Sequence, residues 1–534
     1  MKADHPYPSS LPGEPVGNDP NAAAQESGES LPESAPDLLA DSTKGEGVGL
    51  SDKIRAAVVW RSGSQILAQL ISWTTTLVVV RLLVPADYGL FAMTQVVMGL
   101  LAFLNGYGFA SALVAEKEVT PFRIRQAFGL LILMNLAVAM AQLALAPVAA
   151  SYYGQPVIAD MLRIQALMTL STPFIAVPEA LMGRQLDFRR QALVNLAAAS
   201  VAALLSVIMA WRGYGVWTLV IAPIAGFWLR AIGLALATRW LVWPSFNLKG
   251  TGGIAAYGST ILLIQLCWLV QTQSDIFFAG RRYPPHEIGL YSEALFLAMI
   301  FSAKFVPPLN EVAFPAYARL RDDAEEMRRA FVKAARLILA IGLPIYLGIA
   351  ASAEPLIATL FGEKWGGIVP LIVPIALGLP FLTLQILFGP ALNAMGRQLV
   401  TLKLSAFGAA LFALMFFFAS HVSMMRMAQV WLVGSPLYLV MTVLMARPHL
   451  GVRIADLASA LWRPALASAV MAVTVWLADV ELIAPLGWAA PLRLVVLVGI
   501  GAVTYAALMW LVARELVEEA ASQLRLSRGS VRAG

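Results

Sequence analysis

The sequence predicts an all-α integral membrane protein with about fourteen transmembrane helices. Its 534 residues are 59% hydrophobic and only 13% charged, whereas soluble proteins carry about 25% charged residues. The mean hydropathy is +0.73, and apolar runs of about 18 residues or more, long enough to cross a bilayer as helices, recur along most of the chain. An internal duplication predicts how these helices are organised.

The first part of the chain resembles a later part at a shift of 200 positions. The matching pairs are Gln65 and Gln265, Arg81 and Arg281, Pro85 and Pro285, Asp87 and Glu287, Gly89 and Gly289, Leu90 and Leu290, and Phe91 and Tyr291. A second repeat places Met182-Gly183-Arg184-Gln185-Leu186 against Met395-Gly396-Arg397-Gln398-Leu399. Because the first predicted span matches the seventh, the two repeats are expected to be parallel, a plan found in secondary transporters.

The elements follow in order from an acidic N-terminal tail, residues 1–50, whose composition predicts disorder. The predicted spans are 56–80, 88–114, 126–150, 158–182, 190–211, 214–237, 254–279, 288–314, 331–353, 367–389, 399–420, 424–446, 459–480 and 489–513. They form a first six-helix lobe at 51–240, a second at 241–448 and two additional helices at 449–514, before a C-terminal tail at 515–534. The charged stretch 317–330 is expected to form a short separate amphipathic helix.

The distribution of basic residues predicts the orientation of the chain. With the N-terminus in the cytoplasm, the inside loops hold about eighteen Lys and Arg residues and the outside loops about seven. This bias predicts that both termini are cytoplasmic.

The span 56–80 carries a polar stripe. Its members, spaced so that they share one face of a helix, are Arg61, Gln65, Gln69, Ser72 and Thr76. Two interpretations remain open for the amides: hydrogen bonding between helices, or the lining of a cavity. Arg61 lies near the cytoplasmic end, where its side chain can also reach the membrane surface.

The span 254–279 repeats this pattern with Gln265, Thr272 and Asp275. A charge inside a membrane is costly and usually faces a cavity or a partner. Asp275 either lines a cavity or forms a structural ion pair with Arg281 or Arg282.

The span 288–314 contains Glu293, Lys304 and Glu311, whose spacings of 11 and 7 place them on one face of an unbroken helix. Three ionisable groups on one stripe favour a functional cavity over a purely structural charge network. The Pro307-Pro308 pair weakens the placement of Glu311, because it can kink the helix.

Several functional classes are not supported by the sequence. The four histidines show no metal-ligand spacing, and no nucleotide-binding or nucleophile motif is present, so no metal, cofactor or catalytic residue is predicted. The single cysteine, Cys267, allows no intrachain disulfide. Nucleic-acid binding is not expected, because the basic residues are scattered over short loops.

The chain resembles the polysaccharide-transporter branch of the multidrug/oligosaccharidyl-lipid/polysaccharide exporter superfamily, the Wzx-type flippases, and in particular the colanic acid and exopolysaccharide exporters. The similarity covers about residues 50–450. It rests on the stretches beginning Arg81-Leu-Leu-Val-Pro-Ala-Asp-Tyr-Gly-Leu-Phe, Arg184-Gln-Leu-Asp-Phe-Arg-Arg, Gly213-Tyr-Gly-Val-Trp, Asp275-Ile-Phe-Phe-Ala-Gly-Arg, Gly289-Leu-Tyr, Phe314-Pro-Ala-Tyr-Ala-Arg-Leu and Gly362-Glu-Lys-Trp.

This resemblance implies two six-helix lobes around a central cavity, and no enzymatic activity. It implies an inner-membrane transporter for lipopolysaccharide or exopolysaccharide biosynthesis, which flips undecaprenyl-diphosphate-linked oligosaccharide by alternating access, with ion coupling. The residues that would bind the diphosphate are Arg61, Arg163 and Lys304, and those that would contact the sugar are Gln65, Gln69, Trp73, Trp268 and Asn310. Those that would couple transport to an ion are Asp275, Glu293 and Glu311. The expected partners are this lipid-linked substrate, membrane lipids and, as a further hypothesis, the polysaccharide polymerase and export machinery.

Two other functions remain as alternatives. A drug-cation antiporter of the same superfamily would favour an acidic cavity, which Arg61 and Lys304 argue against. A membrane oligosaccharide polymerase or ligase would need large external loops, whereas the loops here are short.

Overall fold

The computed structural model describes residues 50–102, 120–185, 188–238, 243–246, 259–321 and 323–512. The chain divides into two compact units, Met1–Arg55 and Ala56–Gly534. Only the opening residues of one helix belong to the described part of the first unit, so the predicted acidic tail lies outside the described residues. So does the predicted tail at 515–534, and so do most residues around the predicted lobe boundary near 240.

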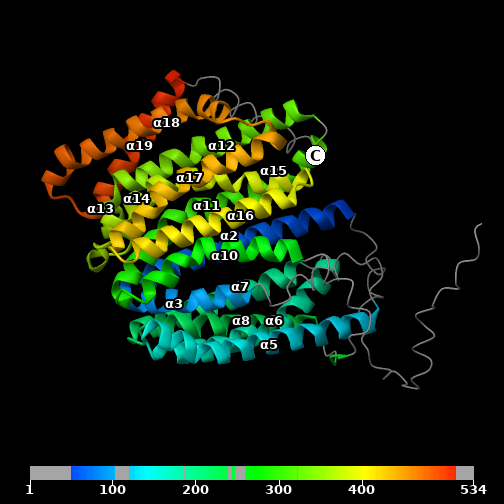
Figure 1. The fold of residues 1–534 in the computed structure, drawn as a ribbon. Coiled ribbons are helices and arrows are strands. Elements are labelled where there is room, and N and C mark those ends of the chain that lie inside the picture. The colour runs from blue at the N-terminus through cyan, green and yellow to red at the C-terminus, as the bar shows by residue number, and fades with distance from the viewer. Residues whose placement is uncertain are drawn as a thin grey trace, which may run out of the picture. The chain divides into compact units, whose positions relative to one another are not determined.

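The described residues are helical and contain no strand, which confirms the predicted fold class (Figure 1). The helices of the first half are α2 (Leu50–Leu82), α3 (Pro85–Ala102), α5 (Pro121–Tyr153), α6 (Val157–Gln185), α7 (Phe188–Trp211) and α8 (Trp217–Ala237). Those of the second half are α10 (Ser259–Gly280), α11 (Pro285–Arg319), α12 (Ala324–Ala351), α13 (Ala353–Leu360), α14 (Ile368–Ile386), α15 (Phe388–Ala394), α16 (Gln398–Ala419) and α17 (Met424–Leu450). The last two long helices are α18 (Ile454–Leu477) and α19 (Ala490–Val512).

Each of the fourteen predicted spans overlaps one of these helices. Within the described ranges, twelve helices are long and apolar enough to cross a membrane. Helices α3 and α10, which occupy the second and seventh predicted spans, are not among the twelve. Both carry several polar side chains, such as Asp87 and Gln95 in α3 and Gln271 and Asp275 in α10, which lower their hydropathy.

The stretch 317–330 does not form a separate helix, so that expectation is wrong. Helix α11 continues to Arg319 and α12 begins at Ala324. The side chain of Asp323 accepts hydrogen bonds from the backbone N–H groups of Glu325 (3.0 Å) and Glu326 (2.9 Å) and so caps α12. The charged residues therefore occupy the ends of two long helices instead of a connecting element.

The first-half helices pack as a group in which α5 lies against α6, and both α6 and α7 lie against α8 (Figure 1). Buried polar contacts connect α5 and α6, as is common between membrane helices. The side chain of Gln142 donates to the backbone oxygen of Leu162 (2.8 Å) and accepts from Thr169 (3.3 Å).

The second half repeats this arrangement, since α14 packs against both α12 and α17, and α17 also packs against α16. Its core is rich in aromatic side chains, including Phe412, Phe416, Trp431 and Tyr438. The repeat is not complete. Helix α10 packs closely along α16, whereas the equivalent helices α2 and α7 are not among the closely packed pairs of the described residues.

The two additional helices attach to the second half: α18 packs along α12, and α19 packs against α18 and α13. A π-helical turn, η4 (Ala478–Ile483), follows α18 and carries the buried Asp479. The Arg493 guanidinium binds both Asp479 (2.5 Å) and Glu354 of α13 (3.0 Å). This ion network fixes the connection between α18 and α19 to the second half.

Helices α3 and α11 bring the two halves together. Their backbones come close together at Gly89 and Gly289, the residues that the sequence repeat pairs. A Cβ atom on Gly89 would overlap the backbone oxygen of Pro285, and one on Gly289 would overlap that of Pro85. Equivalent residues thus face each other across the contact, as expected for two repeats related by an axis between them.

Candidate functional site

A cation and an amide that the sequence singled out meet between α2 and α11. The Nζ atom of Lys304 donates to the Oε1 atom of Gln69 at 3.3 Å. The two residues lie 235 positions apart, one in each half of the chain. This contact is the centre of the candidate site.

The rest of the polar stripe on α2 extends from this contact. Gln65 lies one turn before Gln69 and Trp73 one turn after it, and both side chains are exposed. Thr76 donates to the backbone oxygen of Ser72, a local bond within the helix. Arg61 belongs to α2, but its side chain lies outside the described residues.

Helix α11 runs without interruption through Pro307 and Pro308. Along it the predicted ionisable residues differ in environment: Glu293 is buried, whereas Lys304 and Glu311 are exposed. Asn310, next to Glu311, is half-buried. The predicted stripe therefore combines one buried carboxyl group with two exposed charges.

Asp275 lies in a buried hydrogen-bond network that joins α10, α11 and α17. Its Oδ1 atom accepts from the backbone N–H of Ile276 (2.7 Å), and its Oδ2 atom accepts from the Tyr291 hydroxyl (3.0 Å). The indole N–H of Trp431 donates to the same hydroxyl (2.8 Å). Both carboxyl oxygens thus have a donor, which stabilises this polar group inside the protein.

Asp275 does not form an ion pair with Arg281 or Arg282 in the structure, because both arginines have other partners. The Arg281 guanidinium lies over the ring of Tyr152, 5.2 Å from its centre. Arg282 contacts His421. Asp275 is fully buried, so in this conformation it does not line an open cavity either.

The remaining predicted residues lie apart from the Gln69–Lys304 contact. Arg163 forms an ion pair with Asp160, one turn earlier on α6 (2.7 Å), and both side chains are more than half exposed. Trp268 is exposed on α10. Within the part of the chain that the structure describes, no hydrogen bond or ion pair joins either residue to Lys304.

One polar network in the first half was not predicted from the sequence. Arg230 of α8 forms an ion pair with Glu179 of α6, and Gln191 of α7 donates to the same carboxylate at 3.2 Å. The signal was present, because Arg230 is a charged residue within an otherwise apolar span. Tyr291 and Trp431 gave no such signal, since aromatic residues in a membrane helix are ordinarily part of the core.

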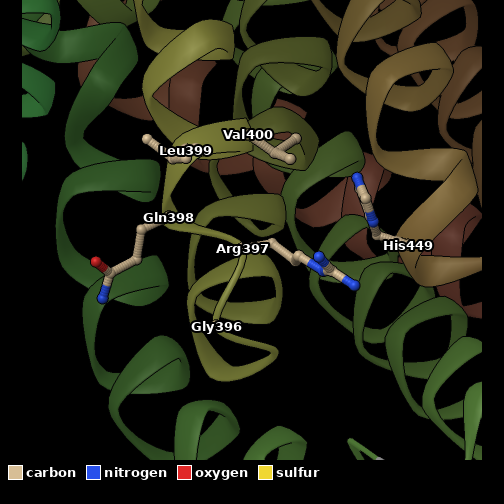
Figure 2. Close-up of a pocket in the computed structure, with 6 residues that line it drawn as sticks. All are labelled: Gly396, Arg397, Gln398, Leu399, Val400 and His449. Carbon is tan, nitrogen blue, oxygen red and sulfur yellow. The ribbon is translucent and has the colours of Figure 1, made fainter.

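A separate pocket of about 270 Å³ lies where α16 begins and α17 ends. Figure 2 shows Arg397 reaching toward the helix that carries His449, while Gln398 points away from both. None of the residues predicted to bind substrate lines this pocket. It is therefore distinct from the candidate site.

The sequence matches a known family over much of its length. The model of the family described as polysaccharide biosynthesis protein covers residues 78–370, which is more than half of the chain. The chain belongs to this family. The resemblance stated from the motifs is thereby confirmed.

Individual members of the polysaccharide biosynthesis protein family are distant relatives. The chain is 25% identical to the succinoglycan biosynthesis transport protein ExoT of Rhizobium meliloti (strain 1021), over 62% of this chain and 67% of that protein. It is 22% identical to the lipopolysaccharide biosynthesis protein WzxC of Escherichia coli (strain K12), over 61% of this chain and 66% of that protein. The alignments thus span about two thirds of these relatives. ExoT is named as a transport protein, and neither relative is named as an enzyme.

Solved structures support the same fold. The lipid II flippase MurJ in an inward closed conformation aligns with 85% of this chain and 100% of its own, with a TM-score of 0.67 at 14% identity. A multidrug resistance MATE family transporter of the MOP superfamily, inward-facing, aligns with 74% of this chain and 98% of its own, with a TM-score of 0.58 at 14% identity. At 14% sequence identity, these structural similarities establish the fold of the chain.

Proposed function

We propose that this protein flips an undecaprenyl-diphosphate-linked oligosaccharide across the bacterial inner membrane during polysaccharide biosynthesis. The observation that carries the proposal is the Lys304–Gln69 contact between helices of the two halves. Membership of the polysaccharide biosynthesis protein family and the names of its relatives support the substrate class.

The chemistry of the contact fits an anionic, sugar-bearing lipid. An ammonium group within a membrane helix is costly, so its retention favours a ligand of opposite charge. The Lys304 ammonium can bind a diphosphate oxygen through a charge-assisted hydrogen bond. The amides of Gln65 and Gln69 can both donate to and accept from sugar hydroxyls, and the exposed ring of Trp73 offers an apolar face to a sugar.

In this proposal Arg61 and Arg163 assist in binding the diphosphate, and Trp268 and Asn310 in binding the sugar. Asp275, Glu293 and Glu311 couple the movement to an ion gradient. Asp275 and Glu293 are buried carboxyl groups, so a change in their ionisation or ion binding would alter packing within the second half. Both termini lie in the cytoplasm, and polysaccharide polymerase and export proteins act on the product.

The proposal is tested in cells that lack the gene and are complemented with variants. Lys304→Met removes the charge while keeping most of the volume, and Lys304→Arg keeps the charge. Lys403→Met is a matched control, because Lys403 is an exposed lysine of another membrane helix, α16. The measurements are surface polysaccharide and the pool of lipid-linked oligosaccharide.

We expect the deletion to lose surface polysaccharide and to accumulate lipid-linked repeat units on the cytoplasmic side. Loss of one charge-assisted hydrogen bond weakens binding about 10- to 100-fold, so Lys304→Met should fail to restore export. Lys304→Arg should restore it in part and Lys403→Met fully. Unchanged polysaccharide together with increased sensitivity to cationic drugs would instead support the antiporter.

A further inference from the structure

Two of the motifs that define the family resemblance meet at one place. The stretch that begins at Arg81 ends α2, and Gly362-Glu-Lys-Trp forms the 3-10 helix η3 (Glu363–Trp365) after α13. They are about 280 positions apart in the sequence, yet hydrogen bonds join them directly. We call this contact the α2–η3 junction; its residues are Val80, Arg81, Thr359, Leu360, Lys364 and Trp365.

Each half caps a helix end of the other half at this junction. Lys364 donates to the backbone oxygen of Arg81 (2.6 Å), and the Trp365 indole N–H donates to that of Val80 (3.0 Å). In the opposite direction, the Arg81 guanidinium donates to the backbone oxygens of Thr359 and Leu360 at the end of α13. The last carbonyl groups of a helix have no partner within it, so cationic and indole donors satisfy them.

Trp365 anchors the junction through packing. Its side chain is completely buried. It packs edge-on against Tyr88 of α3, with ring centres 5.4 Å apart, and against Phe361 of its own half at 5.6 Å. The Gly89–Gly289 backbone contact lies in the opening turns of α3 and α11, and Tyr88 is next to Gly89 in the sequence.

The junction lies between the candidate site and one face of the membrane. Gln69 and Arg81 are both on α2, and twelve residues of helix correspond to about 18 Å along the axis. This is more than half of the ~30 Å hydrocarbon core. With the N-terminus in the cytoplasm, as the charge bias predicts, that face is the periplasmic one.

The donor side chains at the junction have other hydrogen-bond partners available when the junction separates. Arg81 and Lys364 are exposed, so water can replace the carbonyl groups as these bonds break. The pKa of the Lys364 ammonium is lowered, because partial burial outweighs the opposing effect of the nearby Asp87 carboxylate. If the junction separates, the Trp365 indole reaches the membrane–water interface, where tryptophan is favoured.

We propose that Arg81, Lys364 and Trp365 form a gate that closes the periplasmic exit from the Gln69–Lys304 site and opens when the flipped substrate is released. This inference rests on the proposed function for the identity of the substrate. It goes beyond that function by assigning a role to two motifs whose hydrogen bonds at the junction, among the described residues, involve none of the residues predicted to bind substrate.

The test uses the full-length chain with Cys267→Ala, which removes the single native cysteine. Leu82→Cys and Glu363→Cys are then introduced, because both positions are exposed and adjacent to the bonded residues without being among them. A short cleavable cross-linker joins the two cysteines. The control pair is Arg282→Cys with His421→Cys, two residues that contact each other just beyond the ends of α10 and α16, within the second half.

Transport of lipid-linked oligosaccharide is measured in proteoliposomes. Cross-linking Leu82→Cys to Glu363→Cys should lower transport at least about tenfold, because it removes the open state, and cleavage should restore it. The control cross-link should leave transport unchanged. Full transport by the protein cross-linked at the junction would overturn the proposal, because the junction would then be a fixed contact.

A second measurement does not depend on the substrate. Spin labels at positions 82 and 363 should report two distance populations in lipid nanodiscs, one short and one long. Two populations in a protein that does not transport this lipid would retain the gate and reject the proposed substrate. A single short distance, both with and without lipid-linked oligosaccharide, would reject the gate.

Discussion

Replacing Gly89 by alanine is the most direct test of how the two halves meet. A Cβ atom built on Gly89 would lie 1.8 Å from the backbone oxygen of Pro285. A carbon and a carbonyl oxygen ordinarily stay at least about 3.3 Å apart. Helices α3 and α11 would therefore have to separate by roughly 1.5 Å, and a backbone atom cannot rotate away as a side chain can.

The cost of this overlap is about 1–3 kcal/mol, the range for overpacking a well-packed interface. Alanine also has a helix propensity about 1 kcal/mol better than glycine. That gain applies to every conformation in which α3 is helical, so it does not favour one conformation over another. A net difference of about 1–3 kcal/mol shifts an equilibrium about 5- to 150-fold.

The assay is the distance between spin labels at positions 82 and 363, together with the thermal unfolding temperature. We expect Gly89→Ala to lower the short-distance population and Gly289→Ala to do the same, because each Cβ meets the proline carbonyl of the other half. Gly499→Ala in α19 is the matched control, since a Cβ there would have no atom within 4 Å.

Two results separate the possible meanings of this contact. A lower unfolding temperature with unchanged distances would show that α3 and α11 touch in every conformation. Unchanged distances together with an unchanged unfolding temperature would refute the close backbone approach itself.

Three further substitutions test the buried networks. Asp275→Ala leaves the Tyr291 hydroxyl without its acceptor and should destabilise the fold by about 1–3 kcal/mol, measured by chemical unfolding; a loss below about 0.5 kcal/mol would contradict the buried network. Asp275→Asn should keep the unfolding midpoint near that of the wild type but remove the dependence of transport on an ion gradient, and retained ion dependence would reject the coupling role. Arg493→Met leaves the buried Asp479 unpaired and should cost about 3–5 kcal/mol by the same measurement, whereas a much smaller loss would mean that Glu354 and Asp479 do not depend on this arginine.

The sequence was sufficient for the helices because their signal is local. Most spans are long apolar runs, and the length of such a run is set by the thickness of the membrane. The connection between α11 and α12 was mispredicted because its charges suggested an independent amphipathic helix. The cap at Asp323 instead begins α12 within the same charged stretch.

The candidate site was predictable only as separate residues. The spacing of Gln65 and Gln69 gave a stripe on one helix, and Lys304 stood out as a charge on another, but no local pattern says that the two helices touch. The surroundings of Asp275 depend on Tyr291 and Trp431. Tyr291 lies 16 positions from Asp275 in the sequence, and Trp431 lies 140 positions from Tyr291. Contacts of this kind are set by tertiary packing, which a single sequence does not encode as a periodicity.

The α2–η3 junction has an unequal tolerance to substitution. Its acceptors are main-chain oxygens of Val80, Thr359 and Leu360, together with that of Arg81, and every amino acid supplies such an oxygen. Only the donors depend on which amino acid occupies the position, because they are side chains. As the two copies of a duplicated chain diverge by mutation, the main-chain acceptors of their contact are therefore always retained. Selection has to maintain only the donor side chains.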